Sequence, residues 1–429
     1  MELGASRKLA GKEWMIPVLP ANLAAGPLST FIALYILKVG GNALSVAYTF
    51  TLASAIAIPS VFVWGYLTDL LNRRRSLIIF SYLFTAILIL SLFFIKSIYA
   101  IALIYAAITF VWSASGVPLN LLVMDNQNRN EWAKDFSLLQ MISGIGTTLG
   151  LLVSWVVTGV STLNMLLIVL AAFALLSALL AARLIIEPTM SRIKIDLRDG
   201  IHSFMYRLVA IPNMLIRIPH PEVIKNFFKF KHLGSVEKNF IIFFYIVSFI
   251  FFFGTAVFNT EYTVGLKIYG MSESTIFLLG VMAMIAQTAI FYYYDKLTTG
   301  CNETAIAVAS LFSRGASYLA IGILFLLFAQ SPIFYLGNFI FYTFAIGVAY
   351  AIYYPASYNM LFKTLDGHKN GSAMGIYGAV AGGGTLIGTF TSGIFSVDYG
   401  FGMTFVIAAL LMYSCSYLFK ILPKTTIVS

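Results

Sequence analysis

Charge is what this chain of 429 residues has least of. Only 10% of its residues are Asp, Glu, Lys or Arg and 60% are hydrophobic, whereas soluble domains carry roughly 25% charged residues. A chain so poor in charge cannot cover a water-exposed surface, so we predict a polytopic membrane protein. Because each spanning helix takes about 20 apolar residues, the length leaves room for roughly a dozen spans.

Cysteine and histidine are also scarce. Cys301 and Cys415 lie far apart and the four histidines fall in connecting segments, a pattern that gives neither a disulfide framework nor a metal-binding cluster. The sequence contains no Gly-x-x-x-x-Gly-Lys-Ser/Thr loop, which excludes ATP hydrolysis as a built-in source of energy. No pairing of a nucleophile with a base is visible either. We therefore expect no enzyme activity, no metal and no cofactor.

Twelve apolar runs are long enough to cross a bilayer. They form two sets of six, separated by the polar interval 187–238. The first set is predicted at 14–37, 43–68, 76–96, 98–124, 136–159 and 163–186, and the second at 239–264, 272–296, 302–329, 332–362, 371–396 and 400–422. The predicted organisation is an N-terminal bundle at 1–186, a cytoplasmic interfacial linker at 187–238 and a C-terminal bundle at 239–429.

The basic residues predict how the chain is oriented. With both termini in the cytoplasm, 23 of the 27 Lys and Arg residues fall on the cytoplasmic side, three fall outside and Arg314 lies within a span. Membrane insertion favours this asymmetry. The net charge of +10 therefore reflects topology and not nucleic-acid binding. We expect a monomer in the cell membrane, with lipid as its surroundings.

The two sets of spans share an internal repeat. Residues 143–150 and 381–388 have Gly or Thr in common at four of eight positions, at an offset of 238. Pro118 has a counterpart in Pro355, and the pair Leu37-Lys38 has one in Leu266-Lys267. The matches run in one order at nearly one offset, which predicts two parallel six-span repeats related by an axis along the membrane normal.

A polar segment between the second and third spans carries a family resemblance. It runs from Gly65 through Asp69 to the basic residues Arg73, Arg74 and Arg75. This Gly-x-x-x-Asp pattern with a following basic cluster resembles the loop between helices 2 and 3 of the major facilitator superfamily. Together with the repeat, the resemblance implies an all-α membrane protein with twelve transmembrane helices in two six-helix bundles. It also implies that these five residues form a conformational latch at the cytoplasmic face, against the start of the eleventh span around Gly371-Ser372.

The same resemblance implies a substrate cavity between the halves, lined by spans 1, 4, 7 and 10. The candidate residues are the polar and aromatic side chains of those spans. They are Asn22, Thr30, Trp112, Asn120, Asn259, Tyr350, Tyr354, Tyr358 and Asn359, with Ser29 and Tyr262 beside them. The three tyrosines of span 10 share a helix face, and phenol rings suit a solute with an apolar body and a polar group. The alternative is that they belong to the interfacial aromatic belt.

Two charged residues fall inside predicted spans. Glu261 is the only acid well within one, where a carboxyl group is neutral, paired or functional. It is our candidate for taking a proton from one side and releasing it to the other, and the alternative is that it reaches water at the outer end of its span. Arg314 is expected to turn inward and to find a carboxylate or a carbonyl, in a structural role.

These features predict secondary active transport of a small organic solute by alternating access. The first hypothesis is a proton-coupled transporter similar to drug or amphiphile exporters, because the spans are aromatic and poor in charge. Uptake of a neutral metabolite such as a sugar is an alternative that fits the Asn, Gln and Tyr inventory. A sensor with a transporter fold that moves nothing is a third.

Overall fold

The structure, a computed structural model, describes residues 12–71, 73–126, 132–186, 235–329, 331–365 and 370–421. These residues form helices joined by short turns, and they include no strand. Residues 187–234, which make up most of the predicted linker, lie outside the described part. The predicted role of that interval therefore stays a prediction.

The first half of the chain begins with a broken helix. Pro27 ends one helix and opens the next, because a proline ring cannot continue the preceding hydrogen-bonded turn. The first-half elements are η1 (Glu13–Met15), α1 (Val18–Ala25), α2 (Leu28–Lys38), α3 (Ala43–Leu71), α4 (Arg74–Ser91), η2 (Leu92–Phe94), α5 (Ile98–Asn126), α6 (Trp132–Val160) and α7 (Leu163–Leu184).

The second half is also helical, with one π-helical stretch. Its elements are α10 (Ser235–Ile268), α11 (Glu273–Thr298), α12 (Glu303–Leu327), α13 (Pro332–Tyr342), the π-helix η4 (Thr343–Ala349), α14 (Tyr350–Leu365) and α15 (Asn370–Lys420). Ser331 caps α13 by accepting a hydrogen bond from the amide of Phe334, and Pro332 occupies the first helical position. Both choices favour a helix start at this point.

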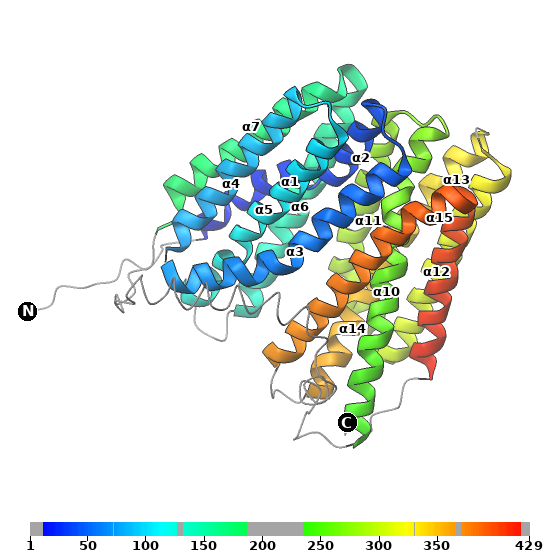
Figure 1. Ribbon diagram of the computed structural model, residues 1–429. Helices are drawn as coiled ribbons and strands as arrows, with labels where there is room; N and C mark the ends of the chain where they lie inside the picture. The colour runs from blue at the N-terminus through cyan, green and yellow to red at the C-terminus, as the bar shows by residue number, and fades with distance from the viewer. Residues whose placement is uncertain are drawn as a thin grey trace, which may run out of the picture.

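Eleven helical stretches of the described residues are long and apolar enough to cross a membrane. The last of them, Ile376–Lys420, has 45 residues, which at 1.5 Å per residue is about twice the thickness of the hydrocarbon core. Gly400 interrupts α15 with φ 79° and ψ 164°, a conformation that glycine reaches readily because it has no Cβ. Figure 1 shows α15 reversing its direction, so its two limbs run antiparallel.

The turns that close the first span of each half have the same hydrogen bonds. Gly40 and Gly270 both have positive φ, of 93° and 91°. The amide of Gly41 bonds the carbonyl of Ile36, and the amide of Met271 bonds that of Leu266, each at 2.9 Å. Equivalent residues are therefore 230 positions apart. The Leu-Lys pairs matched in the sequence at an offset of 229 are one residue out of this register.

The glycine motifs of the two halves play one structural role. In each half, two glycines spaced four apart lie so close to the neighbouring helix that an added Cβ would collide with its backbone carbonyls. The colliding pairs are Gly146 with Leu19, Gly150 with Leu23, Gly384 with Phe249 and Gly388 with Phe253. The glycines are 238 apart and their partners 230 apart, so the α1–α6 and α10–α15 crossings repeat one plan.

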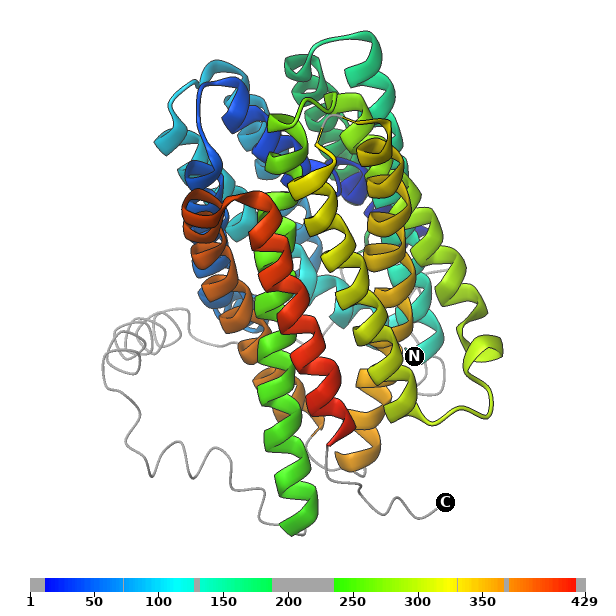
Figure 2. The same ribbon diagram turned by 90° about the vertical axis from the view of Figure 1, so that its right-hand side faces the viewer.

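Helices of each half pack mainly on one another, and the halves meet along two seams. α3 lies against α15 in one seam and α6 against α11 in the other. Figure 2 shows the second limb of α15 (red) between α10 and α12, which pack extensively on α15. The buried core of the second half is dominated by aromatic side chains. Phe258, Tyr318 and Phe405 are fully buried there.

Candidate functional site

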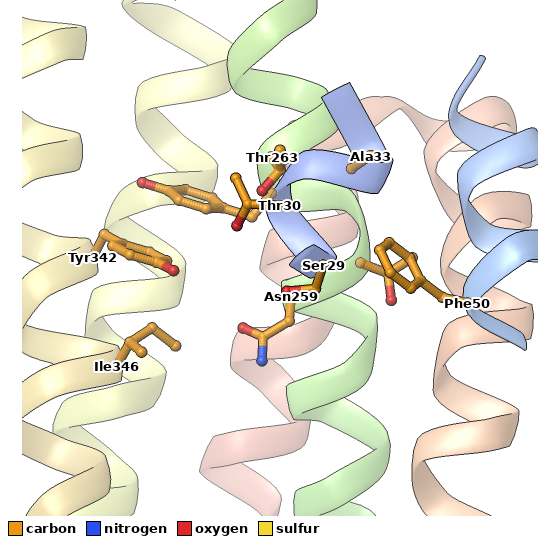
Figure 3. A pocket seen from close by; sticks show the side chains of 10 residues that line it. Ser29, Thr30, Ala33, Phe50, Asn259, Thr263, Tyr342 and Ile346 are labelled. Carbon is orange, nitrogen blue, oxygen red and sulfur yellow. The ribbon is translucent and has the colours of Figure 1, made fainter. Parts of the chain in front are cut away.

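A cavity of about 160 Å³ lies between the two halves. It is enclosed by α2 and α3 of the first half and by α10, α13 and η4 of the second (Figure 3). Seven of the ten lining side chains carry a hydroxyl or amide group, and none is charged. The lining residues are Ser29, Thr30, Ala33, Phe50, Asn259, Thr260, Tyr262, Thr263, Tyr342 and Ile346. The cavity can hydrogen-bond a solute and offers it no counter-ion.

Two stacked tyrosines form one wall of this cavity. Tyr262 of α10 and Tyr342 of α13 have ring centroids 4.4 Å apart and nearly parallel planes. The hydroxyl of Tyr262 donates to Oδ1 of Asn338 at 3.0 Å, and the Asn338 amide donates to the carbonyl of Phe334 at 2.8 Å. Because Asn338 is fully buried and bonded at both ends, it fixes the orientation of Tyr262. Tyr342 adjoins the π-helix η4, a kind of distortion common at functional sites.

The predicted substrate residues Thr30 and Asn259 line the cavity, with Ser29 and Tyr262 beside them. Figure 3 shows Asn259 between Ile346 and Tyr342 on one side and Phe50 on the other. Sequence analysis missed Thr263, although it shares a helix face with Asn259 at i and i+4. It also missed Phe50 and Tyr342, which only the packing of α3 and α13 brings to this point.

Four other predicted substrate residues do not line this cavity. The amide of Asn22 donates to the carbonyl of Val18 in its own helix at 2.9 Å. Trp112 packs on Tyr82, with ring centroids 5.9 Å apart. Asn120 and Asn359 are exposed.

The three predicted tyrosines of span 10 form a continuous row. Ring centroids are 5.5 Å apart between Tyr350 and Tyr354, and 4.6 Å apart between Tyr354 and Tyr358. Tyr377 of α15 extends the row at 5.3 Å from Tyr358. Tyr354 is exposed and its two neighbours are half-buried. The row thus follows span 10 away from the cavity. Its first member, Tyr350, lies about two helical turns beyond the cavity residue Tyr342.

Glu261 is fully buried behind the cavity wall and does not reach water. Its Oε1 lies 3.3 Å from the hydroxyl of Ser392 in α15, and its Oε2 has no hydrogen-bond partner among the described residues. The hydroxyl of Ser392 also lies 2.8 Å from the carbonyl of Thr389. A serine hydroxyl has one hydrogen to donate. The shorter distance indicates that Ser392 donates it to the carbonyl of Thr389 and not to Glu261. A proton on Glu261 would satisfy the remaining contact with Ser392.

Arg314 turns inward, as expected, but its partners are aromatic. Its Nε donates to the hydroxyl of Tyr318 at 2.9 Å, and its guanidinium carbon lies 5.1 to 5.4 Å from three ring centroids. The rings belong to Phe251, Tyr318 and Tyr350. The expected bond to a carboxylate or carbonyl is not among its described contacts. Faces of aromatic rings attract cations, which is why this environment accepts a guanidinium.

The described hydrogen bonds and ring pairs that join the halves all lie toward one end. Thr51 meets Thr389 at 3.3 Å between the hydroxyls, and the hydroxyl of Ser274 donates to the carbonyl of Trp155 at 2.9 Å. These residues belong to the first part of α3 and the last part of α6. At the opposite end, an added Cβ on Gly65, Gly116, Gly144 or Gly378 would meet nothing within 4 Å. Figure 1 shows α3 and the first limb of α15 diverging toward that end.

Comparison with known families agrees with this architecture. Residues 23–407 match the MFS_1 like family. The chain belongs to this family. It is therefore a multi-pass membrane protein and a secondary transporter of the major facilitator type, and not an enzyme. A comparison with curated proteins finds no match.

Solved structures share the fold of this MFS_1 like protein. A POT family transporter in complex with 5-aminolevulinic acid has a TM-score of 0.74 at 11% identity, covering 99% of this chain and 97% of that one. The nucleoside transporter NupG has a TM-score of 0.67 at 14% identity, covering 96% and 99%. At these identities the likeness shows the fold alone.

The predicted latch of this MFS_1 like protein is only partly described. The side chains of Asp69, Gly371 and Ser372 lie outside the described residues, while Arg73 is exposed. Arg74 donates to the carbonyl of Leu121 at 3.2 Å, and Arg75 donates to that of Ala182. Both acceptors belong to the first half, so these bonds tie α4 to α5 and α7.

Proposed function

We propose that this protein moves a small, hydroxyl-bearing polar solute across the cell membrane by alternating access. The observation that carries the proposal is the lining of the central cavity, in which seven of ten side chains carry a hydroxyl or an amide. A few placed polar groups of this kind fix the orientation of a ligand and give specificity. They can replace the water that surrounds the hydroxyls of a sugar-like solute.

The size and lining of the cavity favour a metabolite over a drug-like amphiphile. Sites for drug-sized ligands enclose roughly 300 to 1,000 Å³ and are mostly apolar, whereas this cavity encloses about 160 Å³ and only Ala33, Phe50 and Ile346 contribute an apolar lining. The drug-exporter hypothesis from the sequence has no comparable support. The direction of net transport follows from the coupling and not from the cavity.

We propose further that the chain spans the membrane twelve times, with the two limbs of α15 as the eleventh and twelfth spans. Residues 1–186 and 239–429 would be six-helix bundles joined by a cytoplasmic linker at 187–238, with both termini in the cytoplasm. In this orientation the joined end of the halves faces outward. The conformation would then be inward-facing, and transport would require the α3–α15 and α6–α11 seams to open.

Proton coupling through Glu261 is the third part of the proposal. Glu261 is fully buried next to the wall residues Thr260 and Tyr262, so a change in its protonation would act on the solute site through the segment of α10 that these residues share. A buried carboxylate without a partner is costly, which favours a protonated Glu261 in the closed site. Release of the proton would require access to water, which alternating access provides in turn to each side.

The test is solute flux in proteoliposomes containing the purified protein. A thermal-shift screen over sugars, nucleosides, amino acids, lipophilic cations and carboxylates would first identify a ligand. We expect a small polyol or sugar to stabilise the protein, and its labelled form to enter liposomes faster when an inward proton gradient is applied. Stabilisation by lipophilic cations alone would overturn the solute class. Binding without flux would favour the non-transporting sensor.

A further inference from the structure

The core of the second half holds a positive charge that the proposed solute site does not use. Arg314 of α12 is only 2% exposed, and one of its terminal nitrogens, Nη1, is buried without a hydrogen-bond partner among the described residues. Its described contacts are the hydroxyl of Tyr318 and the three ring faces. The rings stabilise the charge, but they give the two N–H donors of Nη1 no acceptor.

A second unpartnered donor belongs to a tyrosine that packs on the same ring, Phe251. The hydroxyl of Tyr353 is buried and has no hydrogen-bond partner in the part of the chain that the structure describes, and Tyr353 itself is 1% exposed. Its ring centroid is 4.4 Å from that of Phe251, over which Arg314 lies at 5.1 Å. Buried polar groups are nearly always hydrogen-bonded. Two such donors beside one phenylalanine therefore lack an acceptor among the described residues, and one of them carries a positive charge.

The protein supplies no counter-ion for this charge among the described residues. The described ion pairs are Lys12 with Asp135 and Lys267 with Glu273. Among the described residues of the second half, the buried acid is Glu261, which contacts Ser392. If Glu261 carries a proton, as proposed above, it does not compensate Arg314. An isolated buried charge is unfavourable, so an anion bound here would lower the free energy of the folded state.

We propose that Arg314 and Tyr353 bind a small anionic group, which is either a carboxylate of the transported solute or a free halide. The first source rests on the proposed transport function, and the second does not. Tyr350 separates the guanidinium from the exposed Tyr354, with centroid distances of 5.4 Å to Arg314 and 5.5 Å to Tyr354. Rotation of this one half-buried ring would connect the site to the row of tyrosines.

The experiment is a thermal-shift titration of the purified full-length protein at fixed pH and ionic strength. Chloride, acetate and gluconate are each compared with the bulky buffer anion HEPES, and acetamide and glucose serve as the neutral counterparts of the two carboxylates. We expect at least one small anion to raise the midpoint by several degrees in a saturable manner, while acetamide has no effect. A shift by chloride alone identifies a halide site, and a larger shift by gluconate identifies a carboxylate of the solute.

Variants separate binding from general stability. Arg314→Gln is expected to abolish the shift, and Tyr353→Phe, which loses only a hydroxyl, is expected to weaken the apparent affinity several-fold. Ser416→Ala is the control, because it removes a buried hydroxyl of the same half that bonds the carbonyl of Val308. Equal behaviour of all anions and HEPES would overturn the proposal. An unchanged shift in both single variants, Arg314→Gln and Tyr353→Phe, would also overturn it. Neither result would bear on solute flux.

Discussion

The two halves of this transporter share a backbone plan and differ in what they bury. Their first spans end in equivalent turns at Gly40 and Gly270. The offset of 230 places Phe31 where the second half has Glu261, and both side chains are fully buried. Small residues at helix crossings therefore set the scaffold twice, whereas a few polar replacements place Glu261 and Arg314 within the helical core of the second half. The proton coupling proposed for Glu261 would therefore belong to the second half, opposite a cavity wall without a buried acid at the equivalent position of the first half.

The largest expected effect tests the shared scaffold. Gly150→Leu and Gly388→Leu should both strongly reduce folding, because each new side chain would collide with a carbonyl of the facing helix. Overpacking costs about 1–3 kcal/mol, and a rigid backbone carbonyl allows little relief. The measurement is the yield and thermal midpoint of purified protein.

Matched controls for the scaffold are Gly144→Leu and Gly378→Leu, where an added side chain begins in open space. These variants should fold normally. If one half tolerated its crowded leucine and the other did not, the two crossings would not be energetically equivalent.

The next effect concerns the buried acid of the second half. Glu261→Gln should keep solute binding, because glutamine resembles the protonated carboxyl in shape, but it should lose the acceleration of uptake by an inward proton gradient. We expect the gradient-driven acceleration of uptake to fall about tenfold, which is below the effect of about a hundredfold or more that a general acid–base residue has in an enzyme. Uptake in proteoliposomes with and without the gradient measures it, and Ser416→Ala is the control. A gradient response equal to that of the wild type would assign proton coupling elsewhere.

A smaller effect compares polar residues at the cavity with one outside it. Asn259→Ala should weaken binding of the identified solute about fivefold to tenfold, because a hydrogen bond is worth about 1–1.5 kcal/mol. Thr263→Val should have a similar effect. Asn22→Ala should change affinity little, since its amide already bonds its own helix. Ligand titration by thermal shift or tryptophan fluorescence decides, and equal losses at Asn22 and Asn259 would argue against this cavity as the solute site.

The smallest effect concerns the predicted latch, whose acidic residue Asp69 has no acidic counterpart at the equivalent position of the second half. Asp69→Asn should leave folding and insertion normal and slow transport about fivefold, the scale of one surface charge interaction near 1 kcal/mol. Thr299 stands at the equivalent position of the second half, and Thr299→Ala should have less effect. Initial rates of uptake measure both. Transport at the wild-type rate in Asp69→Asn would remove the latch from the mechanism.

Features with a long sequence signal could be predicted. The helical class and the boundaries of most spans follow from apolar runs of about 20 residues, because a spanning helix must cross the hydrocarbon core. The family was predicted from the resemblance of the Gly65–Arg75 segment and from the repeat. The glycine repeat was also visible, although its role in the crossings was not. The site was predicted less completely. Thr30 and Asn259 were found from their spans, while Phe50 and Tyr342 were not, because a cavity wall is assembled from helices remote in sequence.

By itself, the sequence determined that this protein lives in a bilayer, how its basic residues bias its orientation, and that its halves repeat. These properties depend on composition and spacing, because each segment partitions between water and lipid according to its own hydropathy and charge. Only the tertiary structure decided that Glu261 faces Ser392 and that Arg314 lies among rings and not beside an acid. The physical reason is that helix packing determines the partner of a buried polar group. Helical periodicity shows which residues share a face of one helix, but it does not show which other helix packs against that face.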